Sequence, residues 1–214
     1  MDALRARGTE LYPAAFRPSS SLGDFHSTFG HLEAGTKDKE TVVRLAGRVS
    51  SRRESSKKLV FFDLEGGGET VQVMANRSAY GDDAEAFEAI VMAVRRGDVI
   101  GVEGHPARTK VGELSVVPTE ITMLAPCLHN LPAPGALKDP SLRLRQRYLE
   151  LLVNDHLARS LRIRAQVLGH VRRFLEDRGF LEVETPTLSA TAGGAIAKPF
   201  STESQALWLD VQPA

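Results

Sequence analysis

The order of strand-like and helix-like segments between residues 41 and 124 constrains the fold of this chain more than any other feature of its sequence. The strand-like runs are rich in Val, Leu, Ile and Phe and are separated by turn residues such as the glycines at 66–68. One run instead spaces its apolar residues at i, i+3, i+4 and i+7, which is typical of a helix face: Phe87, Ile90, Val91 and Val94. The sequence therefore predicts strands at 41–49, 58–63 and 70–75, a helix at 83–94, and strands at 99–105 and 114–124.

A five-stranded Greek-key β-barrel with a helix between its third and fourth strands has this order. We therefore predict an OB-fold for residues 41–125. The preceding residues 1–40 are expected to form a short N-terminal helix and a lead-in segment, which is polar and Gly-containing, without regular structure, over 19–40.

Prolines and a glycine mark a domain boundary after the barrel, because these residues are typical of linkers. The sequence therefore predicts a linker over 126–140. The residues that mark it are Pro126, Pro132, Pro134, Gly135 and Pro140. Residues 141–214 are then expected to open a second, α/β domain. The pair Asp139-Pro140 is typical of a helix start, because proline at the first helical position loses no hydrogen bond.

Two helices and a strand are expected in this second domain, at 141–154, 161–178 and 180–183. The second helix carries apolar residues that are expected to line a buried face: Val167, Val171, Phe174 and Leu175. Gly179 stands where a helix C-cap is expected.

Composition excludes several classes of protein. Of the 214 residues, 42% are apolar and 25% charged, which is typical of a chain with a packed core. The single cysteine, Cys127, excludes intrachain disulfides, and the scattered histidines predict no metal site. No apolar run approaches the roughly 20 residues that span a bilayer, so no membrane partner is expected. The net charge is zero, but residues 138–178 hold ten Lys and Arg against five Asp and Glu.

OB-folds commonly bind single-stranded nucleic acid by stacking bases on exposed aromatic rings. Phe61 and Phe62 are consecutive on the second strand, so one must face out of the barrel and the other in. Gln72 could read a base edge with its amide. Arginines at the end of the first strand could meet phosphates: Arg48, Arg52 and Arg53. The alternative is that both rings are packed and the arginines belong to a solvated loop.

Short motifs follow one another in order along most of the chain. They lie at 58–64, 71–76, 95–103, 112–115, 126–129, 137–140, 145–149, 179–186 and 193–200, and include Pro126-Cys-Leu-His129 and Gly193-Gly-Ala-Ile-Ala-Lys-Pro-Phe200. Together they resemble the lysyl-tRNA synthetases, a family of class II aminoacyl-tRNA synthetases. The motifs at 126–129 and 193–200 favour the lysine enzymes over the related aspartate and asparagine enzymes.

This resemblance implies that the OB-fold binds the anticodon of tRNA(Lys). By position, Phe61 resembles the family's base-stacking aromatic residue, Gln72 its reader of an anticodon uridine, and Glu120 a further anticodon contact. Arg48 and Arg52 are expected to support binding from the end of the first strand.

The resemblance also assigns roles after the linker. Residues 179–188 resemble motif 1, which forms the homodimer interface in this family, through Gly179, Phe180, Glu184 and Pro186. The segment with Gly193, Gly194 and Ala197 resembles the start of the family's lysine-binding loop.

In this family the lysine carboxylate attacks the α-phosphate of ATP, and cationic side chains from motifs 2 and 3 act there with Mg²⁺. Neither motif is found in this sequence. We therefore expect an incomplete class II antiparallel α/β catalytic domain, with no catalytic residue in this chain and no activity of the chain alone. The alternative is a standalone tRNA-binding or subunit-pairing module. The cytoplasm is the expected location, with an organelle as the alternative.

Overall fold

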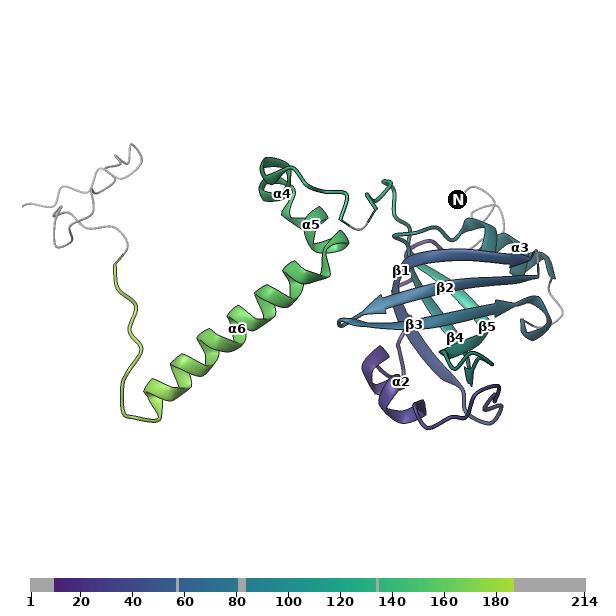
Figure 1. Cartoon of the computed structure of the whole chain (residues 1–214), viewed down its shortest axis with the longest axis horizontal. Coiled ribbons are helices and arrows are strands. Elements are labelled where there is room, and N and C mark those ends of the chain that lie inside the picture. Colours follow the sequence, from purple (N-terminus) through teal and green to yellow (C-terminus); the bar gives the residue numbers. More distant parts are fainter. Residues whose placement is uncertain (1–9, 57, 81–83, 134, 187–214) are drawn as a thin grey trace, which may run out of the picture. The chain divides into compact units, whose positions relative to one another are not determined.

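Five strands form a closed barrel in the computed structural model, which describes residues 10–56, 58–80, 84–133 and 135–186. Their order around the barrel is β1-β2-β3-β5-β4 (Figure 1). The strands are β1 (Val43–Ser56), β2 (Leu59–Gly66), β3 (Glu69–Asn76), β4 (Val99–Arg108) and β5 (Leu114–Ala125). All neighbours are antiparallel except β3 and β5, which close the barrel in parallel at Gln72↔Ser115 and Val73↔Val116. The predicted five-stranded barrel is confirmed.

Alternation along the strands fills the barrel interior. On β2, Phe62 and Leu64 are fully buried, whereas Phe61 and Asp63 between and beside them are half-buried on the outer face. The prediction that one phenylalanine faces in and the other out is therefore confirmed. Helix α3 (Ala84–Ala93) has the predicted apolar stripe, since Phe87, Ile90, Val91 and Val94 are all buried in the same core.

The lead-in segment is more regular than expected. Helix α2 (Leu22–Phe29) begins at Ser21, whose hydroxyl accepts from the backbone N–H of Asp24 while the Asp24 carboxylate accepts from the Ser21 N–H. This capping box is readable in the sequence as Ser-x-x-Asp, and Leu22 and Phe25 bury the helix on the barrel core. The expectation of no regular structure over 19–40 was therefore wrong.

The start of the linker is bound to the barrel. Arg96 donates to the carbonyls of Ser50, Leu131 and Pro132 at 3.1, 3.0 and 2.9 Å. Asp98, which is fully buried, accepts from the backbone N–H of Cys127 at 2.6 Å. The first part of the Pro-rich linker therefore follows a fixed path on the barrel.

Two short helices follow where one was predicted. Asp139 caps α4 (Pro140–Arg145) as expected, and α5 (Arg147–Val153) begins after Gln146 leaves helical geometry at φ −110°, ψ 58°. Glu150 on α5 is buried, and its carboxylate accepts from Arg143 of α4 at 2.6 Å and from Arg147 of α5 at 2.7 Å. A buried carboxylate needs such partners, so the break accompanies a folded contact between the two helices.

Helix α6 (Asp155–Glu176) is followed by a turn in which the Gly179 N–H donates to the Glu176 carbonyl. The φ of +83° at Gly179 confirms the predicted C-cap. Its predicted buried face is exposed: Val167, Val171, Phe174 and Leu175 are 40–55% accessible, although the Arg178 guanidinium lies 3.5 Å from the centroid of the Phe174 ring. The predicted strand at 180–183 is also wrong, since residues 180–186 have no regular structure and no described segment pairs with them. By its contacts the chain divides into two units, 1–160 and 161–214. None of the helices described is both long and apolar enough to cross a membrane.

Candidate nucleic-acid interface

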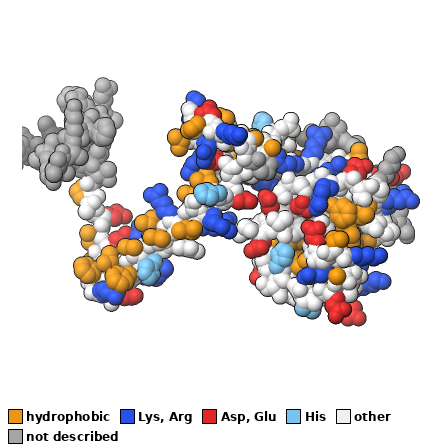
Figure 2. Space-filling view, viewed as in Figure 1, with side chains coloured by type: hydrophobic (Ala, Val, Ile, Leu, Met, Phe, Trp, Pro, Cys, Tyr) orange, Lys and Arg blue, Asp and Glu red, His pale blue; other side chains and the backbone are white. Residues whose placement is uncertain are grey.

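A hollow of about 510 Å³ lies on the outer face of the barrel. Phe61, Gln72 and Met74 reach it from β2 and β3, and the turn between β4 and β5 overhangs it. Figure 2 shows hydrophobic side chains gathered over β2 and β3, with Lys and Arg side chains around them. The remaining lining residues are Gly35, Thr36, Lys37, Arg53, Ala107, Arg108, Thr109, Lys110, Val111, Glu113 and Val117. Both principal residues predicted from the sequence, Phe61 and Gln72, are therefore brought together.

Strand register produces an aromatic platform at this hollow. Arg53 on β1 lies opposite Phe61 on β2, and Phe61 lies opposite Met74 on β3. Directly opposed residues project from the same face of a sheet, so these three side chains form one row on the outer face. Phe61 is half-buried within the row. This arrangement supplies the flat apolar surface on which a base can stack.

Gln72 is held in a defined orientation beside the platform. Its side chain is buried, with 5% exposed. The Ser115 hydroxyl donates to its Oε1 at 3.0 Å, and its Nε2 donates to the Glu113 carboxylate at 2.6 Å. Because a carboxylate only accepts hydrogen bonds, the end of the Gln72 amide that contacts Glu113 must be the nitrogen. Because an amide nitrogen carries two hydrogens, one N–H of Gln72 remains for another acceptor.

Glu113 is a residue of this site that the sequence analysis did not assign. It stands within the segment Gly112-Glu-Leu-Ser115, which was used only as a sign of resemblance. The signal that could have identified Glu113 is its place beside the turn between β4 and β5, which lines the same hollow as β2 and β3. Its contact with Gln72 joins residues 41 positions apart, so no local pattern reveals it.

The cations around the hollow differ in how they are bound. Arg53 lies 3.1 Å from the Asp63 carboxylate, which also accepts from the Ser51 hydroxyl. Arg108 donates to the carbonyls of Gly112 and Gly30. The pKa of Lys37 is lowered by partial burial and by the neighbouring charge of Lys39. Together the lining holds four cationic side chains and one carboxylate, and such a balance attracts anions.

Three residues expected to contact the anticodon lie outside the hollow. Arg48 donates to the carbonyl of Gly97 at 2.7 Å, and Arg52 lies 3.2 Å from Glu54. Glu120 is exposed opposite Glu103 on the β4–β5 pair. The structure therefore does not bring them to Phe61 and Gln72, and their roles stay predictions.

The residues expected after the linker are only partly described. Gly179, Phe180, Glu184 and Pro186 follow α6, and Phe180 is exposed. The expected lysine-binding residues lie outside the described residues: Gly193, Gly194 and Ala197. Within the described ranges no three His, Cys, Asp or Glu side chains converge where they could hold a metal ion.

Two protein families match the chain. The tRNA synthetases class II (D, K and N) match residues 139–211, and the OB-fold nucleic acid binding domain matches residues 43–124. The predicted fold class, an OB-fold followed by the start of a class II synthetase domain, is confirmed.

Lysine–tRNA ligases align with nearly the whole chain. The enzyme of Cladosporium cladosporioides is 39% identical over 206 residues, which is 94% of this chain and 34% of that protein. A probable cytoplasmic lysine–tRNA ligase of Encephalitozoon cuniculi is 40% identical over 207 residues, 95% of this chain and 39% of that protein. The enzyme of Rhizobium meliloti is 38% identical over 214 residues, 99% of this chain and 41% of that protein. The chain therefore spans less than half the length of these relatives.

The hydrogen bond from Ser115 to Gln72 is expected to stabilise the barrel. In Ser115→Ala the buried Oε1 of Gln72 loses its donor, which should lower the free energy of unfolding by about 1–3 kcal/mol. Urea denaturation followed by circular dichroism measures this value. Ser78→Ala, which removes an exposed hydroxyl, is the matched control and should change stability by less than about 0.5 kcal/mol. Equal stability of the two variants would contradict the role given to Ser115.

Proposed function

This chain belongs to the lysyl-tRNA synthetase family of class II, and on that basis we propose that the protein acts in the ATP-dependent ligation of lysine to tRNA(Lys), with its barrel binding the anticodon. The observation that carries the anticodon-binding role is the pairing of Phe61 with the oriented amide of Gln72 at one hollow. We also propose that the protein is located in the cytoplasm.

Anticodon binding at this hollow combines stacking and base-edge recognition. A base stacks on the exposed side of Phe61, and the remaining N–H of Gln72 donates to a carbonyl on the base edge. A uracil presents such a carbonyl, O4, whereas cytosine presents an amino group at that position and would face donor with donor. The Glu113 carboxylate lies beside Gln72 and provides an acceptor for the ring N–H of uracil. The pair therefore favours uracil over cytosine.

The ligase reaction that we propose for the whole protein has two steps. The lysine carboxylate attacks the α-phosphate of ATP and pyrophosphate leaves, and the lysyl group then passes to the tRNA. Cationic groups must stabilise the negative charge that develops on the phosphate oxygens. The segments that carry such groups in this family, motifs 2 and 3, have no counterpart in these 214 residues. The chain therefore supplies tRNA recognition rather than the chemical step.

Helix α6 favours a second role for this chain, the pairing of subunits. Successive residues of a helix are separated by about 100°, which places its exposed apolar side chains on one side. Seven of them are 40–55% accessible: Leu161, Ile163, Val167, Leu168, Val171, Phe174 and Leu175. Phe180, Leu181 and Val183 after the helix are also exposed. A continuous apolar surface of this kind is typical of a protein–protein interface, so we propose a homodimer formed through α6 and residues 179–186.

Removing the stacking surface should weaken RNA binding. Phe61→Ala is expected to reduce affinity for a tRNA transcript with a UUU anticodon by about 1–3 kcal/mol, or about 5- to 150-fold. Phe61→Tyr keeps an aromatic ring and should retain most of the affinity. Fluorescence anisotropy at fixed salt measures both variants. Wild-type affinity in a folded Phe61→Ala variant would refute the stacking role, and absence of wild-type binding would refute tRNA recognition by this chain.

The purified 214-residue chain should show no lysine-dependent exchange of pyrophosphate into ATP, because it lacks motifs 2 and 3. The exchange of labelled pyrophosphate is measured with and without lysine. The lysine–tRNA ligase of Rhizobium meliloti serves as the positive control. Any lysine-dependent exchange by the 214-residue chain would contradict this expectation.

A charge placed on the apolar side of α6 should disrupt subunit pairing. Phe174→Glu is expected to shift the chain toward the monomer in sedimentation equilibrium, because the carboxylate would be desolvated in the interface. Gln166→Glu adds the same charge outside the apolar side, about 140° around the helix from its centre at Val171, and should leave the association unchanged. A monomeric wild type, or equal association of both variants, would rule out pairing through this surface.

A further inference from the structure

The lead-in segment extends the barrel at the edge of the hollow. Its backbone runs beside β4, where the Asp38 N–H donates to the Pro106 carbonyl and the Arg108 N–H donates to the Thr36 carbonyl, both at 2.9 Å. Lys37 pairs with Ala107 across this contact. These bonds fix the backbone of Lys37, and its side chain lines the hollow that also holds Phe61.

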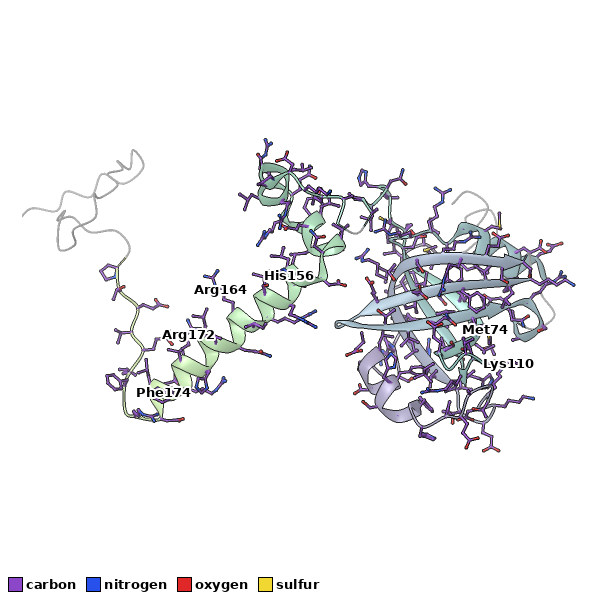
Figure 3. All side chains as sticks on the ribbon, viewed as in Figure 1. Met74, Lys110, His156, Arg164, Arg172 and Phe174 are labelled. Atoms are coloured by element: carbon purple, nitrogen blue, oxygen red, sulfur yellow. The ribbon has the colours of Figure 1, made fainter. Side chains whose placement is uncertain are left out.

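Lys110 reaches the same hollow from the turn between β4 and β5. This turn is held by hydrogen bonds between Thr109 and Glu113 and by Gly112, whose φ of +90° suits glycine. The Lys110 side chain lies against Gly35 of the lead-in segment, since a Cβ on that glycine would be 3.8 Å from the Lys110 Cγ. Figure 3 shows Lys110 on the same side of the barrel as Met74 of the platform. Two separate segments therefore place ammonium groups at the rim of the platform.

These two lysines differ from the arginines of the hollow in their partners. Arg53 is already paired with Asp63. In the part of the chain that the structure describes, no carboxylate lies within ion-pair distance of Lys37 or Lys110. Partial burial and the neighbouring charge of Lys39 both lower the pKa of Lys37, because they disfavour its charged form. A bound anion would act in the opposite direction and favour the ammonium form.

We propose that Lys37 and Lys110 bind the backbone phosphates on either side of the base that stacks on Phe61. This inference rests on the proposed binding of RNA at the hollow and adds the residues that fix the strand there. Phosphate contacts position a nucleic acid, while the stacked base and the amide of Gln72 select it. An acidic peptide would satisfy the lysines as well, but it would make no use of the aromatic row or the buried amide. The occupant is therefore a single-stranded RNA segment.

The salt dependence of binding tests this proposal. Each phosphate contact on a single strand contributes about 0.7 to the slope of log affinity against log salt concentration. Lys37→Ala and Lys110→Ala should each reduce that slope by about 0.7 and the double variant by about 1.4. Lys39→Ala removes a neighbouring charge outside the hollow and is the matched control, with an unchanged slope. Anisotropy of the 214-residue chain with a labelled anticodon stem–loop RNA over a series of NaCl concentrations gives these slopes.

A second probe separates phosphate binding from other effects. In an RNA whose two linkages flanking the anticodon uridine are neutral methylphosphonates, Lys37→Ala and Lys110→Ala should bind as the wild type does. Three results would each overturn the phosphate-binding role. The first is that the two variants bind this neutral RNA more weakly than the wild type does. The second is that their salt slopes equal that of Lys39→Ala, and the third is that polyglutamate competes as strongly as RNA. If wild-type binding and the effect of Phe61→Ala persist alongside such a result, the anticodon-binding proposal stands. If the wild type binds no RNA, that proposal fails as well.

Discussion

Closure of the barrel is the constraint on which the candidate site depends. Five strands share one interior, so each must turn alternate side chains inward, and Phe62 and Leu64 occupy that interior. Phe61 is then forced to the outer face. Closure also brings β3 beside β5, a parallel contact of only two residue pairs, and this contact sets Ser115 against Gln72. The platform and the oriented amide are therefore both consequences of closing the barrel.

Buried polar groups fix those parts of the structure that the alternation of inward and outward side chains along the strands does not determine. Gln72, Asp98 and Glu150 are all buried, and each is hydrogen bonded to residues from another segment. An unsatisfied buried polar group is costly, so such groups permit one arrangement of their partners. Ser115 and Glu113 orient the side-chain amide of Gln72. Asp98 holds the start of the linker together with Arg96, and Glu150 joins α4 to α5. These contacts fix the orientation of the Gln72 amide and the path of the linker start on the barrel.

The position of Glu113 is the basis of the base selectivity that we propose for this face. Its carboxylate accepts one hydrogen of the Gln72 amide and leaves the other for a ligand. The lysines on the rim carry no such directional information, because an ammonium group acts as a point charge on a flexible stem. In the proposed interface, selection of the base and retention of the strand are thus separate: buried groups that cannot reorient would select the base, and exposed groups that can reorient would retain the strand.

The sequence by itself determined the order of the strands, the helix stripe ending in Val94, the start of α4 at Asp139, and that Phe61 and Phe62 project to opposite faces of their strand. These features depend on periodicity and capping between residues that are close in the chain. Only the tertiary structure decided that Glu113 contacts Gln72, that Lys37 lies beside Ala107, and that Glu120 falls outside the hollow. It also decided that the apolar side of α6 is exposed and that residues 180–183 form no strand. Such features arise from pairing between distant segments, and local spacing shows which side of an element is apolar but not what covers it.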